Sequence, residues 1–219
     1  MTDARKEDDK MNVLMINGSP NTKGCTFTAL TEIGKTLQEQ KIDYEIMQLG
    51  KQPIRDCINC CHGEGCIFDD DMVNEFIQKA KDADGFVFGT PVYYAHPSGR
   101  LLSFLDRAFY SSASSRIYKP FQFKPAAAIA SARRAGTTAS IDVINKYFSI
   151  AMMPIVSSTY WNMVHGLTPE DVMQDKEGLQ TMRNIGKNMA WMLQCIACAK
   201  QHNIPQPQPD VADSTNFIH

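Results

Sequence analysis

The stretch NGSPNTKGCTFTAL, residues 17–30, decides how this chain folds. It follows a short apolar run, VLMI at 13–16, and it opens a segment whose apolar residues are spaced by three and four positions. A short apolar run bounded by glycine is typical of a buried parallel strand, and the spacing is typical of a helix. The stretch therefore predicts a strand, a glycine-containing loop and a helix in direct succession.

The same succession of strand and helix recurs along the chain. Strands are predicted at 12–17, 43–49, 84–94, 125–132 and 152–158, and helices at 26–40, 69–82, 98–110, 137–150 and about 177–200. Alternating strands and helices with short connections indicate an α/β fold with a parallel sheet and helices on both faces. The segment 159–176 is predicted to be a long connection.

Composition indicates a globular chain and gives expectations about its partners. The 219 residues are 43% hydrophobic and 21% charged, with a net charge of −2, so we expect no nucleic-acid partner and no membrane partner. The polar start and the seven cysteines, an odd number, favour a reducing cytoplasm. We expect a disordered extension at 1–11, one domain at 12–201 and a polar, proline-rich tail at 202–219.

The loop after the first strand has the composition of a phosphate site. Two glycines allow close approach of the backbone, and polar side chains surround them: Ser19, Asn21, Thr22 and Thr26. The loop matches neither G-x-x-x-x-G-K-[ST] nor G-x-G-x-x-G, which favours a monophosphate over a nucleoside triphosphate or a dinucleotide. The alternative is an ordinary capped turn with Thr26 as the N-cap.

Two further loops are predicted to lie at the same edge of the sheet. GTPVYYAHPSG, residues 89–99, follows the third strand and carries adjacent tyrosines suited to a flat ring. SARRAGTT, residues 131–138, follows the fourth strand and carries two arginines that could meet phosphates or ring carbonyls. Open parallel sheets bind ligands beyond the C-terminal ends of their strands. Surface aromatics and solvated charge are the alternative interpretations.

Together these motifs resemble the NADPH-dependent FMN reductase family of flavodoxin-like proteins, near its iron–sulfur flavoprotein branch. The similarity covers roughly residues 12–200 and rests on GSPNTKGCT, GTPVYYAHPSGRLLSFLDR, ARRAGT and DKEGLQTMRNIGKNMAWML. It implies a flavodoxin-like three-layer fold, with a five-stranded parallel sheet in the order 2-1-3-4-5. It also implies non-covalent FMN, NAD(P)H as electron donor, and a homodimer or homotetramer.

The resemblance also implies a set of binding residues. The phosphate would be held by Ser19, Asn21, Gly24 and Thr26, and the isoalloxazine would be lined by Thr90, Pro91, Val92, Tyr93 and Tyr94. The other side of the pocket would be closed by Ser131, Arg133 and Gly136. This chain departs from the family at two places, where Asn21 replaces a frequent arginine and Cys25 a frequent asparagine, so the phosphate contacts are expected to be rearranged.

The segment CINCCHGEGC, residues 57–66, holds four cysteines: Cys57, Cys60, Cys61 and Cys66. Four thiolates could hold a [4Fe–4S] cluster or zinc. The branch pattern is C-x2-C-x2-C-x4–7-C, but here Gly63 stands at the third place and Cys61 adjoins Cys60. We therefore favour a cysteine-rich loop, with or without a redox-active pair, next to the flavin or at an interface, and keep the cluster as the less favoured alternative.

The function implied is an NAD(P)H-dependent flavin oxidoreductase. It would pass electrons through FMN to a flavin, quinone, nitro compound or protein acceptor. No side chain is predicted as a catalytic acid, base or nucleophile, because FMN carries the chemistry. The alternatives are an electron-transfer protein, as a flavodoxin or an iron–sulfur flavoprotein would be, and a non-enzymatic flavin-binding module.

Overall fold

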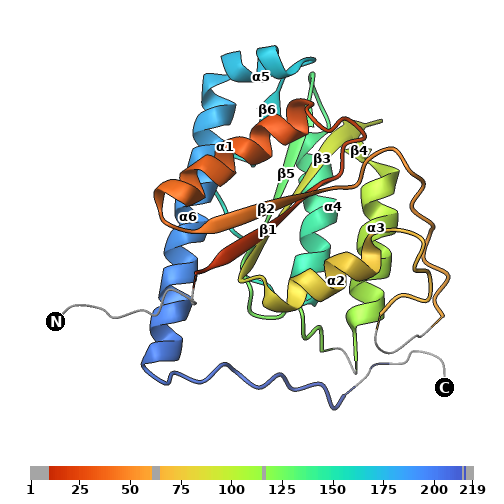
Figure 1. Ribbon diagram of the computed structural model, residues 1–219, viewed down its shortest axis with the longest axis vertical. Coiled ribbons are helices and arrows are strands. Elements are labelled where there is room, and N and C mark those ends of the chain that lie inside the picture. Colours follow the sequence, from red (N-terminus) through yellow and green to blue (C-terminus); the bar gives the residue numbers. More distant parts are fainter. Residues whose placement is uncertain (1–9, 61–64, 115–116, 214, 216–219) are drawn as a thin grey trace.

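A parallel β-sheet forms the middle layer of the protein in the computed structural model, which describes residues 10–60, 65–114, 117–213 and 215 (Figure 1). Its parallel strands are β1 (Asn12–Asn17), β2 (Asp43–Gln48), β3 (Gly85–Tyr93), β5 (Ala126–Ala132) and β6 (Met163–His165). They lie in the order β2-β1-β3-β5-β6, and the short β4 (His96–Pro97) pairs antiparallel with β3. Because β4 is a hairpin arm, β5 and β6 are the fourth and fifth parallel strands of the chain. The predicted flavodoxin-like order 2-1-3-4-5 is therefore confirmed.

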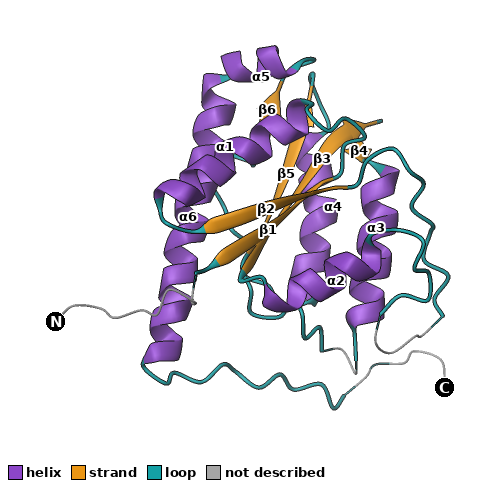
Figure 2. Cartoon of the chain, in the orientation of Figure 1, coloured by secondary structure: helices purple, strands orange, loops and turns teal. Residues whose placement is uncertain are grey.

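Helices cover both faces of the sheet (Figure 2). One face carries α1 (Cys25–Glu39), α5 (Pro169–Gln174) and α6 (Lys176–Gln201), and the other carries α2 (Val73–Asp82), α3 (Gly99–Ser112) and α4 (Thr137–Ile150). The side chains of β1 alternate between the two cores, because successive strand residues point to opposite faces. Leu14 and Ile16 join the core under α2, α3 and α4, whereas Val13 and Met15 join the core under α1 and α6.

The core under α2, α3 and α4 is rich in phenylalanine. The rings of Phe109 and Phe121 stack with centroids 4.3 Å apart, and Phe76 lies 4.9 Å from Phe104. Aromatic pairs in these geometries add stability beyond the area they bury. This packing gives a rigid base from which the loops at the strand ends project.

The last parallel strand lies later in the chain than the sequence predicts. We predicted it at 152–158, but that segment contributes an isolated bridge between Ile155 and Ala126, and the ladder next to β5 is made by β6. Residues 159–176, predicted to be a connection, contain β6 and α5. Both the position of the fifth strand and the content of this segment were therefore wrong in the prediction.

The reason lies in how the chain passes the edge of β5. Pro154 has no N–H to donate to a strand ladder. After Val156, which donates to the carbonyl of Ala126 (2.8 Å), the chain turns away from the sheet. The buried side chain of Asn162 donates to the carbonyl of Val156 (3.2 Å) and closes this excursion just before β6.

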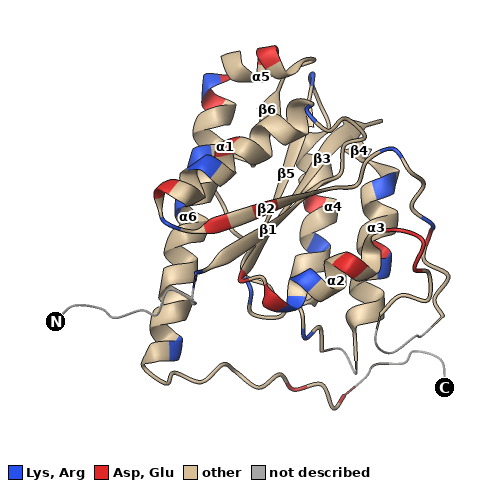
Figure 3. Cartoon of the chain, viewed as in Figure 1, with Lys and Arg blue, Asp and Glu red and all other residues tan. Residues whose placement is uncertain are grey.

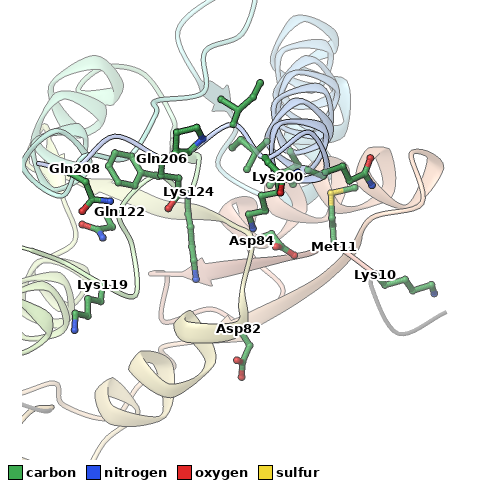
Figure 4. Close-up of a pocket in the computed structure, with 18 residues that line it drawn as sticks. Lys10, Met11, Asp82, Asp84, Lys119, Gln122, Lys124, Lys200, Gln206 and Gln208 are labelled. Atoms are coloured by element: carbon green, nitrogen blue, oxygen red, sulfur yellow. The ribbon is translucent and has the colours of Figure 1, made fainter. Parts of the chain in front are cut away.

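The C-terminal segment leaves the body after α6. Residues 203–213 contain no helix or strand. Residues 203–206 and Gln208 line, with the N-terminal ends of the strands, a cavity of about 1060 Å³ (Figure 4). On its wall Lys124 donates to the carbonyls of Ala80 (2.7 Å) and Lys81 (2.9 Å) at the end of α2. Burial lowers the pKa of this lysine. The cavity lies at the N-terminal ends of the strands, opposite the predicted ligand edge.

The extension predicted at 1–11 and the tail predicted at 202–219 are described only in part. Most of the extension predicted at 1–11 and the end of the tail at 216–219 lie outside the described residues. Within the described residues, no helix combines the length and the apolar character needed to cross a membrane. Figure 3 shows acidic and basic positions spread over the helices of both layers.

Candidate functional site

Three loops meet at the C-terminal edge of the sheet, after β1, β3 and β5. The register that pairs Asn17 with Gly89 and Pro91 with Ser131 brings their starting points together. The side chain of Ser98 joins two of them, because its hydroxyl donates to the carbonyl of Gly18 (3.0 Å). Ligands of open α/β sheets bind at this edge.

The loop after β1 is shaped by two side chains that the sequence analysis missed. The side-chain oxygen of the fully buried Asn17 accepts from the backbone N–H of Ser19 (3.1 Å), and its amide donates to Gln48 (2.5 Å). Gln48 in turn donates to the carbonyl of Ser19 (2.5 Å). The hydroxyl of Ser19 accepts from the N–H of Asn21 (3.1 Å), so it is used inside the loop.

The start of α1 leaves its N–H groups available. The N-cap is Gly24, which has no side chain to accept a hydrogen bond, and the first turn contains no acidic residue. Asn21, Thr22 and Gly24 line a cavity of about 420 Å³ beside it. Free N–H groups and the helix dipole favour an anion at such a place.

Thr26 is not the N-cap that the alternative interpretation required. It lies inside α1, and its buried hydroxyl is 2.8 Å from the hydroxyl of Ser131. These two predicted binding residues therefore contact each other beneath the loops. Neither hydroxyl is exposed at the mouth of the site.

Cys25 begins α1 and faces the loop before α5. Its Sγ lies 3.7 Å from the carbonyl oxygen of Gly166. Burial raises the pKa of the thiol, and the nearby carboxylates of Asp171 and Glu170 raise it further. A neutral thiol therefore stands where the family frequently has asparagine.

The loop after β3 is a tight hairpin. Tyr94 and Ala95 connect β3 to β4 with φ of 51° and 58°, the left-handed backbone of a type I′ turn. Non-glycine residues rarely adopt this conformation, and its strain is typical of functional sites. Tyr94 is fully exposed and Tyr93 is about half exposed, whereas Thr90 is buried and accepts from the N–H of Ser98 (3.0 Å). Pro91 and Val92 are half-buried between them.

The loop after β5 closes against this hairpin. Gly136 has φ of +98°, and a Cβ on it would lie 2.4 Å from the Cα of Ala95 and 2.8 Å from the side chain of Val92. A glycine is required there, and it is also the N-cap of α4, with no side-chain cap. Arg133 is exposed on the same loop.

The cysteine-rich segment is held by a buried arginine. Arg107 on α3 has a side chain only 1% exposed, pairs with Asp71, and donates from Nε to the Sγ of Cys66 (3.1 Å). Desolvation opposes its charge, but the bonds to Asp71 and Cys66 outweigh this and raise the pKa of the guanidinium. The helix predicted at 69–82 begins at Val73. Asp71, just before it, makes the ion pair with Arg107 and accepts from the N–H of Val73 (3.1 Å).

The described cysteines do not assemble a metal site. Cys57 is half-buried and Cys60 is exposed, while Cys66 is engaged by Arg107. Across the residues that the structure describes, no group of three His, Cys, Asp or Glu side chains is placed to hold a metal ion. Cys61 lies outside these residues.

The loops at the sheet edge, in contrast, fit FMN. An uncapped helix start, a cavity beside it and closely packed glycine positions are the features that a phosphate and a flat ring require. The model of the NADPH-dependent FMN reductase family matches residues 11–168. The chain belongs to this family of FMN-binding, flavodoxin-like oxidoreductases.

Individual relatives agree with the family. An iron–sulfur flavoprotein of Methanocaldococcus jannaschii is 33% identical over 198 residues, covering 85% of this chain and 99% of the relative. An FMN reductase (NADPH) of Pseudomonas putida is 31% identical over 96 residues, covering 44% of this chain and 46% of the relative. The structure of an NAD(P)H:quinone oxidoreductase from Methanothermobacter marburgensis superimposes with a TM-score of 0.62 at 16% identity, covering 82% and 99%. It shows the shared fold.

Proposed function

We propose that the protein is an NAD(P)H-dependent FMN oxidoreductase that delivers electrons to a flavin, quinone, nitro compound or protein acceptor. The observation that carries the proposal is the meeting of three loops at one sheet edge, in a chain of the FMN reductase family. The exposed hairpin at Tyr93 and Tyr94 leaves one side of this edge open to a second substrate.

The chain's own residues would bind and orient the cofactor. The N–H groups at the start of α1, with Ser19, Asn21, Thr22, Gly24 and Cys25 around them, would receive the phosphate. Residues 90–94 and the loop Ser131–Gly136 would flank the ring, and Gly136 would set the spacing between these two loops. Bound FMN would supply the hydride and electron chemistry.

The same loops would supply electrostatic stabilisation. The backbone N–H groups of Thr90 and of residues 92–94, together with the guanidinium of Arg133, are suited to stabilise negative charge on a reduced ring. Fixed dipoles of this kind need no reorganisation during the reaction. Thr26 and Ser131 would act beneath the site by fixing α1 to β5.

A second candidate function is electron transfer without turnover of NAD(P)H. It is favoured by the name iron–sulfur flavoprotein, which several relatives carry. The engagement of Cys66 by Arg107 speaks against a cluster built on that cysteine. Iron analysis of anaerobically purified protein separates an iron–sulfur carrier from the reductase, and reduction by NAD(P)H separates a carrier that holds FMN alone.

The proposed function is tested by anaerobic spectroscopy. Purified protein supplemented with FMN should show flavin absorbance bands that bleach within seconds of adding NADPH or NADH. Bands that neither nucleotide changes would contradict the reductase and leave a carrier or binding module. A protein that takes up no FMN would contradict the flavin site itself.

Assembly is part of the proposal. We propose a homodimer or homotetramer, because Tyr160, Trp161 and Trp191 are exposed on and beside α6. Exposed aromatic residues are enriched at protein interfaces. Sedimentation of the native protein and of Trp191→Ser would test this, and a monomeric wild type would contradict it.

A further inference from the structure

The cavity beside α1 is basic. Of the residues that line it, Lys23 and Lys51 are the charged ones; the others are Pro20, Asn21, Thr22, Gly24, Gly50 and Pro169. Lys23 comes from the loop after β1 and Lys51 from the segment after β2, so two separate elements bring positive charge to one hollow. Figure 3 shows basic positions on both connecting segments.

The position of Lys51 is fixed by the end of β2. Gln48 donates to the carbonyl of Ser19 (2.5 Å), and the N–H of Leu49 donates to the carbonyl of Asn17 (3.1 Å). Gly50 then turns the chain with φ of +66°, a backbone conformation that glycine adopts without strain. These contacts hold Lys51 at the cavity wall.

Two carboxylates of α5 lie near the same loop, next to Pro169 of the cavity wall. Glu170 and Asp171 on α5 lie close enough to raise the pKa of Cys25 at the start of α1. Asp171 is engaged by the N–H groups of Leu167 and Thr168 (3.0 Å each), but Glu170 adds a second carboxylate. A phosphate dianion at this place would be repelled by both, so its binding requires compensating cations.

This chain also lacks the cation that its resemblance to the family suggests. Asn21 stands where an arginine is frequent, and it contributes no charge. We propose that Lys23 and Lys51 supply that charge, and that this lysine pair makes the site select FMN over riboflavin. The inference rests on the proposed FMN site, and it assigns the recognition of the phosphate to residues outside the shared loop motif.

The test compares two ligands that differ only in the phosphate. Dissociation constants of FMN and riboflavin are measured by fluorescence titration for the wild type, Lys23→Gln, Lys51→Gln and the double variant. Lys35→Gln, an exposed lysine in the middle of α1, is the matched control. Each site variant should weaken FMN about fivefold, which corresponds to about 1 kcal/mol, and leave riboflavin unchanged.

Three outcomes decide whether Lys23 and Lys51 recognise the phosphate. A loss confined to FMN, reduced by added salt and restored by Lys51→Arg, supports the lysine pair. Unchanged FMN affinity in the double variant, or an equal loss for FMN and riboflavin, overturns it while leaving the FMN site intact. A wild type that binds neither ligand overturns the proposed function as well.

Discussion

The side-chain oxygens of Thr26 and Ser131 lie 2.8 Å apart, which joins the first turn of α1 to the end of β5 beneath the candidate phosphate loop. Both residues are buried, so neither hydroxyl can exchange this partner for bulk water. The helix that would bind the phosphate is thus tied to the strand whose loop would close on the ring.

Thr26→Val removes one partner of this hydrogen bond without a large change in volume. The free energy of unfolding should fall by about 1–3 kcal/mol, because the hydroxyl of Ser131 is left buried without it. The double variant Thr26→Val, Ser131→Ala should lose less than the sum of the single variants. Urea unfolding measures this cycle, and full additivity would show that the two residues are not coupled.

Gly136→Ala should damage the site more than the scaffold. The left-handed backbone costs about 1–2 kcal/mol for alanine, and the added Cβ would meet Ala95 at 2.4 Å. We expect a lower melting temperature and weaker FMN binding. Gly99→Ala is the control, because nothing lies within 4 Å of a Cβ there, and it should be neutral or slightly stabilising. Equal effects of the two substitutions would refute the packing argument.

Arg107→Met tests the arginine that holds the cysteine-rich segment. It leaves the carboxylate of Asp71 without its buried cation, and such losses cost about 3–5 kcal/mol. Cys66 should also react faster with an alkylating reagent, read by mass spectrometry. Arg55→Met removes the exposed pair with Asp70 and should change stability little. Unchanged labelling of Cys66 in Arg107→Met would mean that the arginine does not cover it.

Asp171 should make part of the stability depend on acid pH. The backbone N–H groups of Thr168 and Leu167 lower the pKa of its carboxyl. A lowered pKa stabilises the fold above the unfolded-state value of about 3.9, and this contribution is lost as the pH falls through the folded-state pKa. Asp171→Asn should therefore be less stable at pH 7 and lose less on acidification. Urea midpoints at neutral and acid pH measure the difference, and Asp142→Asn, on the exposed face of α4, should follow the wild type.

Most of the fold could be predicted because it depends on local patterns. Short apolar runs and apolar residues at helical spacing located the first four parallel strands and the long helices. β6 was missed because it has three residues, too few for a pattern, and because the apolar segment 152–158 before it offered a stronger signal. Its place depends on Pro154 and on the bond from Asn162 to Val156, which connect residues apart in sequence.

The candidate site was also predictable where it depends on local sequence, and not where it depends on contacts between residues far apart in the chain. The three loops were predicted because each follows a strand and is rich in glycine or polar residues. Asn17 and Gln48 were missed because their role depends on the register that places them side by side. Arg107 was missed because an arginine in a helix is usually solvated, and nothing local marks this one as buried. The assignment of the predicted residues to FMN itself stays a prediction.

The hairpin tip at Tyr94 and Ala95 has an evolutionary consequence. The ladder between β3 and β4 ends at Tyr93 and His96, so the two residues beyond it carry no part of the sheet. Their exchange leaves the two cores untouched, yet it alters the rim that an incoming molecule meets first. Selection for a new acceptor in the proposed reaction can therefore work on the fully exposed Tyr94 with small risk to folding, whereas Ala95 is constrained by its contact with Gly136. A library randomised at Tyr94 is where altered acceptor preference should emerge.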